Sequence, residues 1–318
     1  MIRRAALHAI PTMVGVVIVS FLMLHLMPGD AVDALAGISG GASAETVAAM
    51  RSAYGLDDPL GVQLARYAAG VFTLDFGHSI SYGAPVFDVI VDRLPATLLL
   101  AATAFTIALV IGVAAGWAMA VFADRWQDRT LSAGVLFLYS APSFWVGLMA
   151  IVVFSAKLNL FPLGGAETIG ADLTGWALVA DRLHHLILPA SALAAFFVAI
   201  YARLTRAAML EVLHQDFIRT ARAKGLHPLR LQFRHGLRNA LIPVVTMAGL
   251  HFGNLVGGAV VVETVFNWPG LGRLTMGALA SRDISVLLGI LLMTSVVVIA
   301  ANILIDWLVA RLDPRVSA

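Results

Sequence analysis

Long stretches without a charged residue dominate the hydrophobic pattern of this chain. A helix that crosses a membrane needs about 20 consecutive apolar residues, because the hydrocarbon core is about 30 Å thick. Six charge-free stretches meet this length or come close to it: 9–27, 95–122, 131–156, 186–202, 240–262 and 284–305. The fourth is the shortest, and it can be extended if the long charged side chains at its ends reach the lipid headgroups. The pattern predicts an all-α integral membrane protein with six transmembrane helices.

The positive charges are distributed unequally between the two sides that six spans define. Of the 21 lysines and arginines, 14 lie on the side of the termini, and eight of these lie in the loop 203–239. Because lysine and arginine are enriched in cytoplasmic loops, both termini are expected in the cytoplasm. The alternative is a cleaved signal peptide, since Arg3 and Arg4 precede the first stretch and 34–36 resembles a cleavage site. The apolar run is too long for a signal peptide, so we expect it to be retained as a span.

The composition excludes an ordinary soluble enzyme. Of the 318 residues, 60% are hydrophobic and only 13% are charged, whereas soluble domains carry about 25% charged residues. The mean hydropathy of +0.88 agrees with this conclusion. The net charge of +2 leaves no broad basic face for nucleic acid. The absence of cysteine excludes disulfides, thiolate metal sites and iron–sulfur clusters.

The segment between the first two spans, 28–94, is longer than a simple connection and is predicted to be helical. One predicted helix covers 44–54 and ends at Gly55. A second begins with Asp58 as its N-cap and Pro59 as its first residue. Its apolar positions recur at helical spacing at Leu60, Leu64 and Tyr67 or Ala68. A small external cap over the membrane domain and a surface elaboration without a ligand both explain this segment.

The predicted spans divide the chain into three parts. Residues 1–94 combine the first transmembrane helix, 9–27, with the external helical segment. Residues 95–305 form a transmembrane core of five helices, which includes a long cytoplasmic loop at 203–243. Residues 306–318 form a cytoplasmic tail. A length of 318 residues suggests two domains only for a soluble chain, so we expect one membrane domain.

The cytoplasmic loop carries the most informative local pattern. Apolar residues at spacings of three or four predict one helix with a single apolar stripe: Leu210, Leu213, Phe217 and Ala221. Cations occupy the last turn of this helix: Arg219, Arg222 and Lys224. Gly225 then ends the helix, and Pro228 begins another. The stripe of the second helix is Leu229, Phe233 and Leu237. A basic helix–glycine–helix element outside the bilayer indicates either a protein partner or contact with anionic lipid.

Polar residues also occur near the end of the chain. The external loop 263–272 contains Pro269, Gly270 and Gly272, which enforce an irregular backbone. Such a backbone near a membrane is tolerated only against protein or a water-filled cavity. Trp268 suits a simple interfacial anchor. The fifth span contains candidates for lining a pathway or for interhelical contacts: Thr246, His251 and Asn254.

Motifs for catalysis are weak or missing in the sequence. Gly37-Ile-Ser-Gly40 matches the short serine pattern of intramembrane proteases, but turn glycines explain it better. His184 and His185 are adjacent and point to different faces of a helix, so no metal site is predicted. The two lysines, Lys157 and Lys224, both lack the context of a phosphate-binding loop, so this chain cannot hydrolyse ATP by that route. If it performs ATP-driven transport, another chain must supply the hydrolysis. A secondary transporter with sodium coupling through backbone carbonyls stays open.

The cytoplasmic loop contains the segments Glu211-Val-Leu-His-Gln-Asp216-Phe-Ile-Arg-Thr-Ala-Arg-Ala-Lys-Gly225 and Leu237-Arg-Asn-Ala-Leu-Ile-Pro243. These segments resemble the "EAA" loop of ABC importer permeases of the dipeptide, oligopeptide and nickel branch, and further motifs along nearly the whole chain resemble that branch in the same order. The other motifs are Leu26-Met-Pro-Gly-Asp30, Tyr54-Gly-Leu-Asp-Asp-Pro-Leu60, Asp75-Phe-Gly-His-Ser79, Arg93-Leu-Pro-Ala-Thr97, Ser140-Ala-Pro-Ser-Phe-Trp145, Glu263-Thr-Val-Phe-Asn-Trp-Pro-Gly-Leu-Gly272 and Leu312-Asp-Pro-Arg315. The long segment after the first span resembles the B-type subunit. Arg219 stands at the position of the glutamate that gives the loop its name, and in this feature the chain resembles the peptide branch.

The resemblance implies a type I ABC importer permease fold in the bacterial inner membrane. The chain would form half of a transmembrane pathway for peptides or a similar small solute. Its implied partners are a second, C-type permease subunit, two ABC ATPase subunits, an external solute-binding protein and membrane lipid, with no nucleic acid. ATP and Mg²⁺ would be used by the ATPase subunits, while this chain would hold no cofactor, no metal and no catalytic residue.

The resemblance also implies which residues couple the chain to an ATPase. The helix before Gly225 would be a coupling helix in which Phe217 and Ala221 pack into a groove of the ATPase, and closure of the ATPase pair would turn the pathway outward. Polar contacts would come from Asp216, Arg222 and Lys224. The matching residues of the coupling loop are Glu211, Asp216, Phe217, Thr220, Ala221, Arg222, Ala223, Lys224, Gly225, Asn239 and Pro243. Those of the external turn are Glu263, Trp268, Pro269, Gly270 and Gly272.

Overall fold

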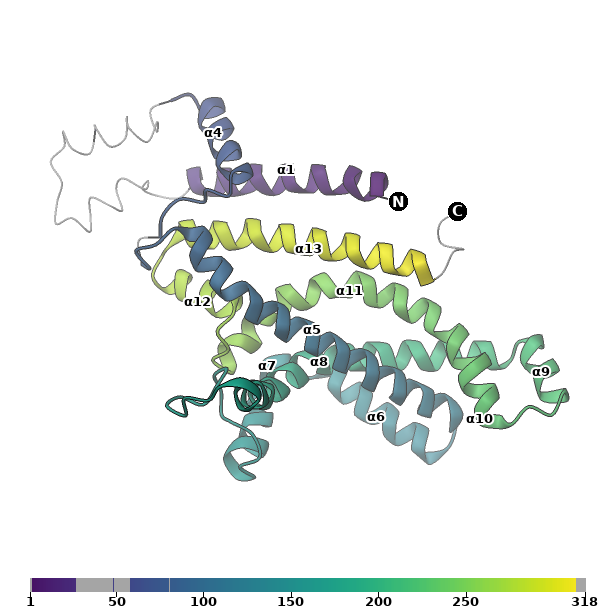
Figure 1. The fold of residues 1–318 in the computed structure, drawn as a ribbon. Coiled ribbons are helices and arrows are strands. Elements are labelled where there is room, and N and C mark those ends of the chain that lie inside the picture. Colours follow the sequence, from purple (N-terminus) through teal and green to yellow (C-terminus); the bar gives the residue numbers. More distant parts are fainter. Residues whose placement is uncertain (1, 27–47, 49–57, 80, 313–318) are drawn as a thin grey trace. The chain divides into compact units, whose positions relative to one another are not determined.

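Helices make up nearly all of the regular structure in the computed structural model, which describes residues 2–26, 48, 58–79 and 81–312 (Figure 1). The helices are α1 (Ile2–Leu26), α4 (Leu60–Phe72), α5 (Val86–Val121), α6 (Trp126–Ser140), α7 (Ser143–Ala150), the π-helix η1 (Ile151–Lys157), α8 (Gly175–Leu213), α9 (Asp216–Ala223), α10 (Pro228–Arg230), the π-helix η2 (Leu231–Leu237), α11 (Arg238–Val265), α12 (Leu271–Ala280) and α13 (Ile284–Leu312). The one extended pairing within these ranges is a bridge between His78 and Pro85. The expected all-α class is confirmed.

Each predicted span coincides with a helix or with a broken pair of helices. Among the described residues, α5, α8 and α13 are long and apolar enough to cross a membrane, and α6 with the helix after it makes a fourth candidate. The first stretch lies in α1, whose apolar part Ile10–Met23 is shorter, and the fifth lies in α11. The fourth stretch, predicted as the shortest, belongs to the 39-residue helix α8. The count of six spans stays a prediction.

The third predicted span, 131–156, is broken in its middle. The helix α6 and the helical segment Ser143–Lys157 are bent by 109° relative to each other. Pro142 has no backbone N–H to continue a helix, and its ring disfavours a helical conformation in the preceding residue. Ala141 is accordingly extended, with φ −79° and ψ 130°. The expectation of one continuous helix at this place is wrong, and the proline of the Ser140–Trp145 motif is the reason.

The contacts within the chain define two compact units. The first unit combines Met1–Leu94 with Leu274–Ile299, and the second combines Pro95–Arg273 with Ala300–Ala318. Most of the last predicted span therefore belongs with the N-terminal part of the chain. The sequence predicts divisions after 94 and 305, which place this span with the central helices. The predicted division and the two compact units therefore differ in where they place most of α13.

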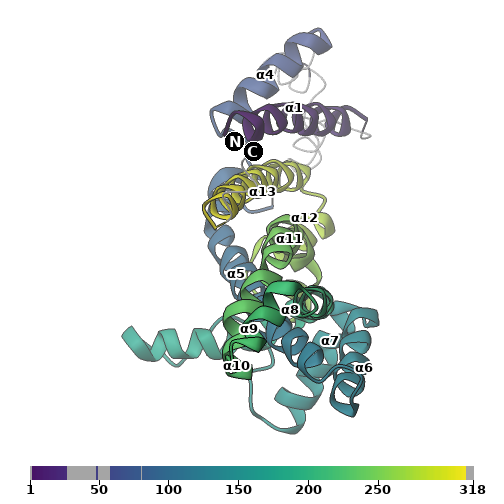
Figure 2. The same cartoon turned by 90° about the vertical axis from the view of Figure 1, so that its right-hand side faces the viewer.

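In the second unit, α8 is the central helix. The helices α6, α7 and α11 all pack along it (Figures 1 and 2). The core around α8 contains Leu193, Phe197 and Tyr201, which lie with Leu100 of α5 and Leu255 of α11 in one buried cluster. The cluster also contains many alanines. Small side chains let helix backbones approach closely, which favours helix association in lipid, where the hydrophobic effect contributes little.

Two glycines place α5 directly against α8. A Cβ atom at Gly112 would lie 2.8 Å from the Cβ of Tyr201 and 3.0 Å from the carbonyl oxygen of Val198. A Cβ atom at Gly116 would overlap the carbonyl oxygen of Ala202 and would lie 2.6 Å from the Cβ of Thr205. Both obstacles lie on or next to the backbone of α8 and cannot turn away. The two helices therefore keep this distance only with glycine at both positions.

In the first unit, α4 packs on α1 and α13 begins at a buried carboxylate. Phe21 of α1 and Tyr67 of α4 have ring centroids 6.0 Å apart. The side chain of Asp283 accepts hydrogen bonds from the Ser79 hydroxyl at 2.6 Å and from the backbone N–H of Ser81 at 3.1 Å. Its other oxygen accepts the N–H of Val286 at 3.2 Å and so caps α13. Ser79 belongs to a motif noted in the sequence, whereas Asp283 was not identified there.

The second predicted external helix is α4, with a corrected start. Pro59 is its N-cap rather than its first helical residue, and Asp58 makes no side-chain cap. The carboxylate of Asp58 instead accepts a hydrogen bond from Arg66 at 2.7 Å. Of the predicted stripe, Leu60 is exposed, while the partly buried members are Leu64, Tyr67 and Ala68. The first predicted external helix, 44–54, falls outside the described residues except at position 48, and the serine motif 37–40 falls outside them entirely.

The glycine contacts predict opposite effects for two alanine substitutions. Gly116→Ala places a methyl group against the backbone of α8 and is expected to destabilise the protein by about 1–3 kcal/mol, as overpacking does. Gly134→Ala in α6, where a Cβ atom would meet nothing within 4 Å, is expected to stabilise it by roughly 1 kcal/mol through helix propensity. Thermal unfolding of the two variants in detergent tests this. Equal melting temperatures would contradict the close approach of α5 and α8.

Candidate functional site

The cytoplasmic loop of the sequence analysis forms a compact turn between α8 and α11. The helix α8 ends at Leu213, the chain turns at His214 and Gln215, and α9 follows from Asp216 to Ala223. The short helix α10 and the π-helix η2 then lead into α11. Figure 1 shows α9 and α10 beyond the ends of α8 and α11. The predicted continuous helix through 210–224 is therefore wrong, because the break at His214 separates it into two.

The inner face of this loop is apolar and packs on the chain itself. Ile218 is fully buried, and it lies in one cluster with Ala221 of α9, Leu231 of η2 and Met209 of α8. The break before α9 shifts the register of its buried face. Phe217, predicted to be in the stripe, is exposed, and Ile218 takes the inner position instead. Ala221 is buried within this chain, so its expected packing against a partner is corrected.

The second predicted stripe is also changed. The buried positions of η2 are Leu231 and Gly236, while Leu229 and Phe233 are exposed and Leu237 is partly buried. One ring face of Phe233 nevertheless stacks on Trp117 of α5, with centroids 4.9 Å apart. A π-helix has a wider turn than an α-helix, so a stripe spaced for an α-helix does not stay on one face.

The outer face of α9 presents an aromatic ring among charges. Phe217 is 41% exposed. The polar residues around it are exposed as well: Asp216, Arg219, Thr220, Arg222 and Lys224. Arg219 and Asp216 form an exposed ion pair at 3.3 Å, which contributes little stability. An exposed aromatic ring on a helix whose opposite face is anchored in the core is a suitable contact for another protein.

Gly225 ends α9 in the conformation that the sequence predicts. Its φ of +75° lies in the left-handed region, and a Cβ atom there would meet nothing within 4 Å. The requirement for glycine is therefore conformational and not steric. The N–H of Gly225 bonds to the carbonyl of Arg222 at 3.0 Å, and the N–H of Leu226 bonds to that of Ala221 at 3.4 Å. This pair of hydrogen bonds is the Schellman motif of a helix C-terminus.

The remaining predicted residues of the loop lie around this turn. Glu211 and Ala223 are exposed. The amide nitrogen of Asn239 donates to the carbonyl of His235 at 2.7 Å, which ties η2 to α11. Pro243 lies inside α11 and is exposed.

An ion pair that the sequence analysis did not identify joins α6 to α8 near this loop. The guanidinium of Arg206 donates two hydrogen bonds to the carboxylate of Asp128, at 2.9 and 2.7 Å. Asp128 is buried, and it also accepts hydrogen bonds from the N–H of Asp124 at 3.1 Å and the hydroxyl of Ser132 at 3.3 Å. A bidentate pair of this kind fixes both distance and orientation. The two residues are 78 positions apart, and no local spacing connects them.

The external turn of the prediction is organised around a buried carboxylate. Glu263 is fully buried at the end of α11. One of its oxygens accepts the hydroxyl of Thr97 at 2.7 Å, and the other accepts the N–H of Gly272 at 2.7 Å and of Arg273 at 3.2 Å. The Thr97 oxygen in turn accepts the N–H of Leu271 at 2.7 Å. Two motifs that lie far apart in the sequence, Arg93–Thr97 and Glu263–Gly272, thus form one hydrogen-bonded cluster.

The other residues of the external turn complete this cluster. Trp268 is 2% exposed, and its indole N–H donates to the carbonyl of Ala96 at 2.9 Å. The expectation that Trp268 is an interfacial anchor is therefore wrong. A Cβ atom at Gly270 would overlap the carboxylate of Glu263, and one at Gly272 would overlap the backbone of Val260. Pro269, which lies between Trp268 and Gly270 in the sequence, is partly buried.

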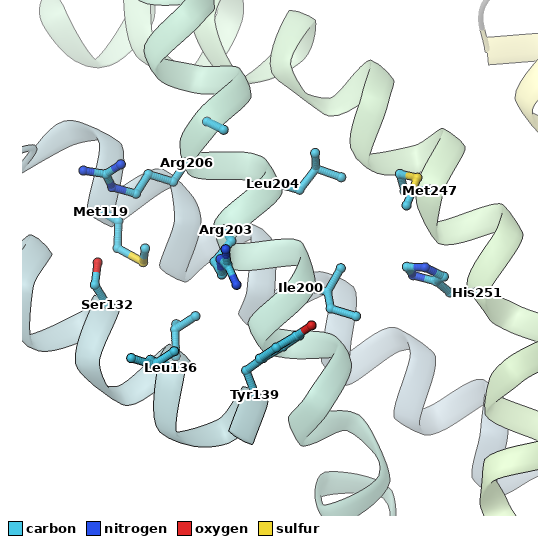
Figure 3. Close-up of a pocket in the computed structure, with 12 residues that line it drawn as sticks. Met119, Ser132, Leu136, Tyr139, Ile200, Arg203, Leu204, Arg206, Met247 and His251 are labelled. Carbon is cyan, nitrogen blue, oxygen red and sulfur yellow. The ribbon is translucent and has the colours of Figure 1, made fainter. Parts of the chain in front are cut away.

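The predicted pathway residues lie along α11. Thr246 is exposed, and its hydroxyl bonds back to the carbonyl of Ile242 at 3.0 Å. His251 is partly buried beside Phe197 and Tyr201, and its Nδ1 atom has no hydrogen-bond partner among the described residues. The side chain of Asn254 lies outside the described part of the structure. His251 lines a cavity (Figure 3).

Comparison with known proteins gives consistent matches over the whole chain. Residues 112–318 match the family described as binding-protein-dependent transport system inner membrane component, and residues 1–101 match the N-terminal region of such components. A putative peptide transport system permease of Brucella abortus is 41% identical over 316 residues, which cover 99% of this chain and 98% of that protein. The oligopeptide permease AppB of Bacillus subtilis is 39% identical over the same shares of both chains. The glutathione permease GsiC of Escherichia coli K12 is 41% identical over 98% of this chain and 97% of its own.

The fold is similar to that of a solved ABC transporter. An inward-facing structure of the methionine transporter MetNI superposes with a TM-score of 0.57 and 19% sequence identity. The match covers 71% of this chain and 96% of the other. The expected type I importer permease fold is therefore confirmed.

The external cluster predicts coupled effects of two substitutions. Thr97→Val and Glu263→Gln each leave buried hydrogen-bonding groups without partners, so each is expected to destabilise the protein by about 1–3 kcal/mol. Because the two side chains share one hydrogen bond, each substitution perturbs the partner of the other, and the double variant is expected to be clearly less destabilised than the sum of the two. Melting temperatures of the four proteins in detergent measure this. Strict additivity would show that the two side chains do not interact.

Proposed function

Because this chain belongs to the family of binding-protein-dependent transport system inner membrane components, we propose that it forms one half of the transmembrane pathway of an ATP-driven importer for peptides or a similar small solute. The observation that supports this proposal most directly is the turn at α9. It combines an exposed aromatic ring with a rigid backbone, and the chain's own hydrophobic core anchors it from behind. A loop of this construction transmits force from a partner to the helices that carry it.

The coupling loop in this proposal is 203–243. The partner surface consists of Phe217 together with the exposed charges of α9, while Ile218 and Ala221 hold the helix on its own chain. Gly225 sets the direction in which the chain leaves α9. Since α8 enters the loop and α11 leaves it, a displacement of α9 acts on both helices. Closure of the ATPases then moves these helices as a rigid body and exposes the pathway to the outside.

The proposed assembly contains a second, C-type permease subunit, two ABC ATPase subunits beneath the membrane and an external solute-binding protein that delivers the solute. The ATPases bind ATP and Mg²⁺. The excess of lysine and arginine on one side supports cytoplasmic termini in a bacterial inner membrane. The names of the relatives, which refer to peptides, oligopeptides and glutathione, support a short peptide or a related molecule as the solute.

Co-purification of the ATPases tests the coupling loop. Phe217→Ala removes an exposed ring and is expected to reduce the ATPase recovered with the chain at least tenfold, since aromatic anchors dominate interfaces. Gly225→Asp is expected to do the same, because it strains the left-handed turn. The matched control is Phe72→Ala in α4, which removes a ring that is 86% exposed on another helix and is expected to leave recovery unchanged.

Two outcomes would contradict the proposal. If Phe217→Ala retains the ATPases as well as wild type does, α9 is not the coupling helix. If no ATPase co-purifies with the wild-type chain, the importer itself is in question and a secondary transporter becomes the better hypothesis.

A further inference from the structure

A partly open cavity of about 760 Å³ in the second unit is lined by α6, α8 and α11 together with Met119 of α5. Its volume is in the range of cavities that hold small molecules. Most of the lining is apolar, but five members carry polar groups: Ser132, Tyr139, Arg203, Arg206 and His251. Charged side chains in membrane helices nearly always face the bundle interior or a water-filled cavity, and they mark the paths of substrates. Part of the lining lies where α8 enters the coupling loop: Arg203, Leu204, Arg206 and Ala207.

The two arginines of the cavity differ in their partners. Arg206 is neutralised by the bidentate hydrogen bonds to Asp128, so it adds little net charge. Arg203 lies one helical turn earlier on α8 and is exposed to the cavity. Within 58–79 and 81–312, no carboxylate forms an ion pair with it. The cavity therefore contains one positive charge without a counter-ion from this part of the chain.

Aromatic stacking holds this charge in place. The guanidinium carbon of Arg203 lies 5.6 Å from the ring centroid of Tyr139 on α6. Tyr139 is itself held in place, because its ring stacks on that of Phe196 of α8. The two ring centroids are 5.3 Å apart, and the angle between the ring planes is 18°. Figure 3 shows Arg203 amid the lining, with Tyr139 nearby and Met247 and His251 across the cavity. A cation–π contact orients a guanidinium while its N–H groups stay available.

We propose that Arg203, positioned over Tyr139, binds the carboxylate of the solute while it passes through the membrane pathway. The inference rests on the proposed function and adds a residue to it. A guanidinium presents paired N–H donors that match a carboxylate, and the match is strongest where water is partly excluded. The apolar remainder of the lining suits side chains of varied shape. A peptide of any sequence has a C-terminal carboxylate, so this contact serves a broad range of peptides.

A lipid phosphate is the other anion that a membrane arginine meets. The cavity favours the solute because Ser132, Tyr139 and His251 line it together with Arg203, whereas surfaces that face acyl chains rarely carry so many polar groups. We therefore assign the cavity to the solute pathway. The second arm of the experiment below distinguishes the solute carboxylate from a lipid phosphate as the anion that meets Arg203.

The first arm measures uptake by the complete transporter in proteoliposomes, with its binding protein and ATP. Trialanine and its C-terminal amide serve as probes, each compared between wild type and variant so that selection by the binding protein cancels. Arg203→Gln is expected to raise the KM for trialanine about tenfold and to leave that for the amide nearly unchanged. Arg203→Lys is expected to restore part of the difference. The matched control, Arg129→Gln, removes an exposed charge of α6 outside the cavity and is expected to change neither.

The results separate the inference from the function on which it rests. Uptake of both probes by Arg203→Gln at wild-type KM would overturn the inference alone, and so would an equal loss for both probes, which indicates a structural role. Wild-type complexes that take up no trialanine in the presence of ATP would contradict the proposed function and the inference with it.

The second arm uses the absence of cysteine from the chain. Leu136→Cys and Met247→Cys place single thiols in the cavity lining, and Val110→Cys places one on α5 at a position that is 63% exposed but outside the cavity. A water-soluble, negatively charged thiosulfonate is expected to label the first two at least tenfold faster than the third. Equal, slow labelling at all three positions would show that lipid fills the cavity, and the assignment to the pathway would be wrong.

Discussion

The close approach of α5 to α8 is the constraint on which the second unit depends. In lipid, helices gain little from burying apolar surface, so they associate by packing closely and by satisfying polar groups. Gly112 and Gly116 permit backbone contact with α8 at Val198 and Ala202. This contact fixes the part of α8 that carries Arg203, Arg206 and the entry to the coupling loop. A side chain at either glycine would move the cavity lining and the end of α8 that leads into α9 together, because both belong to one helix.

Polar groups make the remaining connections, and each of them is buried and multiply bonded. Asp128 joins the start of α6 to α8, Asp283 joins the Ser79 turn to α13 within the first unit, and Glu263 joins the end of α11 to Thr97. Each carboxylate accepts at least three hydrogen bonds. An unpaired carboxylate is costly to bury, so such a group holds its neighbours in one geometry only. Three acids thus give directional contacts to a protein whose apolar contacts are mostly non-directional.

The sequence predicted the fold well where a single period or a single residue governs the structure. Five of the six apolar stretches each lie in one helix, the third is broken at Pro142, and Gly225 has the positive φ expected of a helix-ending glycine. The interior of the cytoplasmic loop was predicted less well. A break at His214 shifts the buried face of α9 by one residue, and a π-helix at Leu231–Leu237 moves the buried positions of the second stripe to Leu231 and Gly236. Neither irregularity can be read from the periodicity. Trp268 was misassigned because its partner, the Ala96 carbonyl, is 172 residues away. The pairs Asp128–Arg206 and Ser79–Asp283 were missed for the same reason, since pairings across a fold are invisible to local spacing.

The bond between Thr97 and Glu263 has a consequence for how the chain is made. The two residues are 166 positions apart, which corresponds to about 8–33 s of translation at common rates of 5–20 residues per second. During that interval the helix that carries Thr97 already exists, while its acceptor has not been synthesised. A threonine hydroxyl tolerates this wait, because it can bond to a carbonyl of its own preceding turn. The carboxylate is the later of the two to emerge, so its Thr97 donor is already present when Glu263 is made, and its two other donors, the N–H groups of Gly272 and Arg273, follow within ten residues. The order of these two residues along the chain thus suits insertion of the protein from its N-terminus.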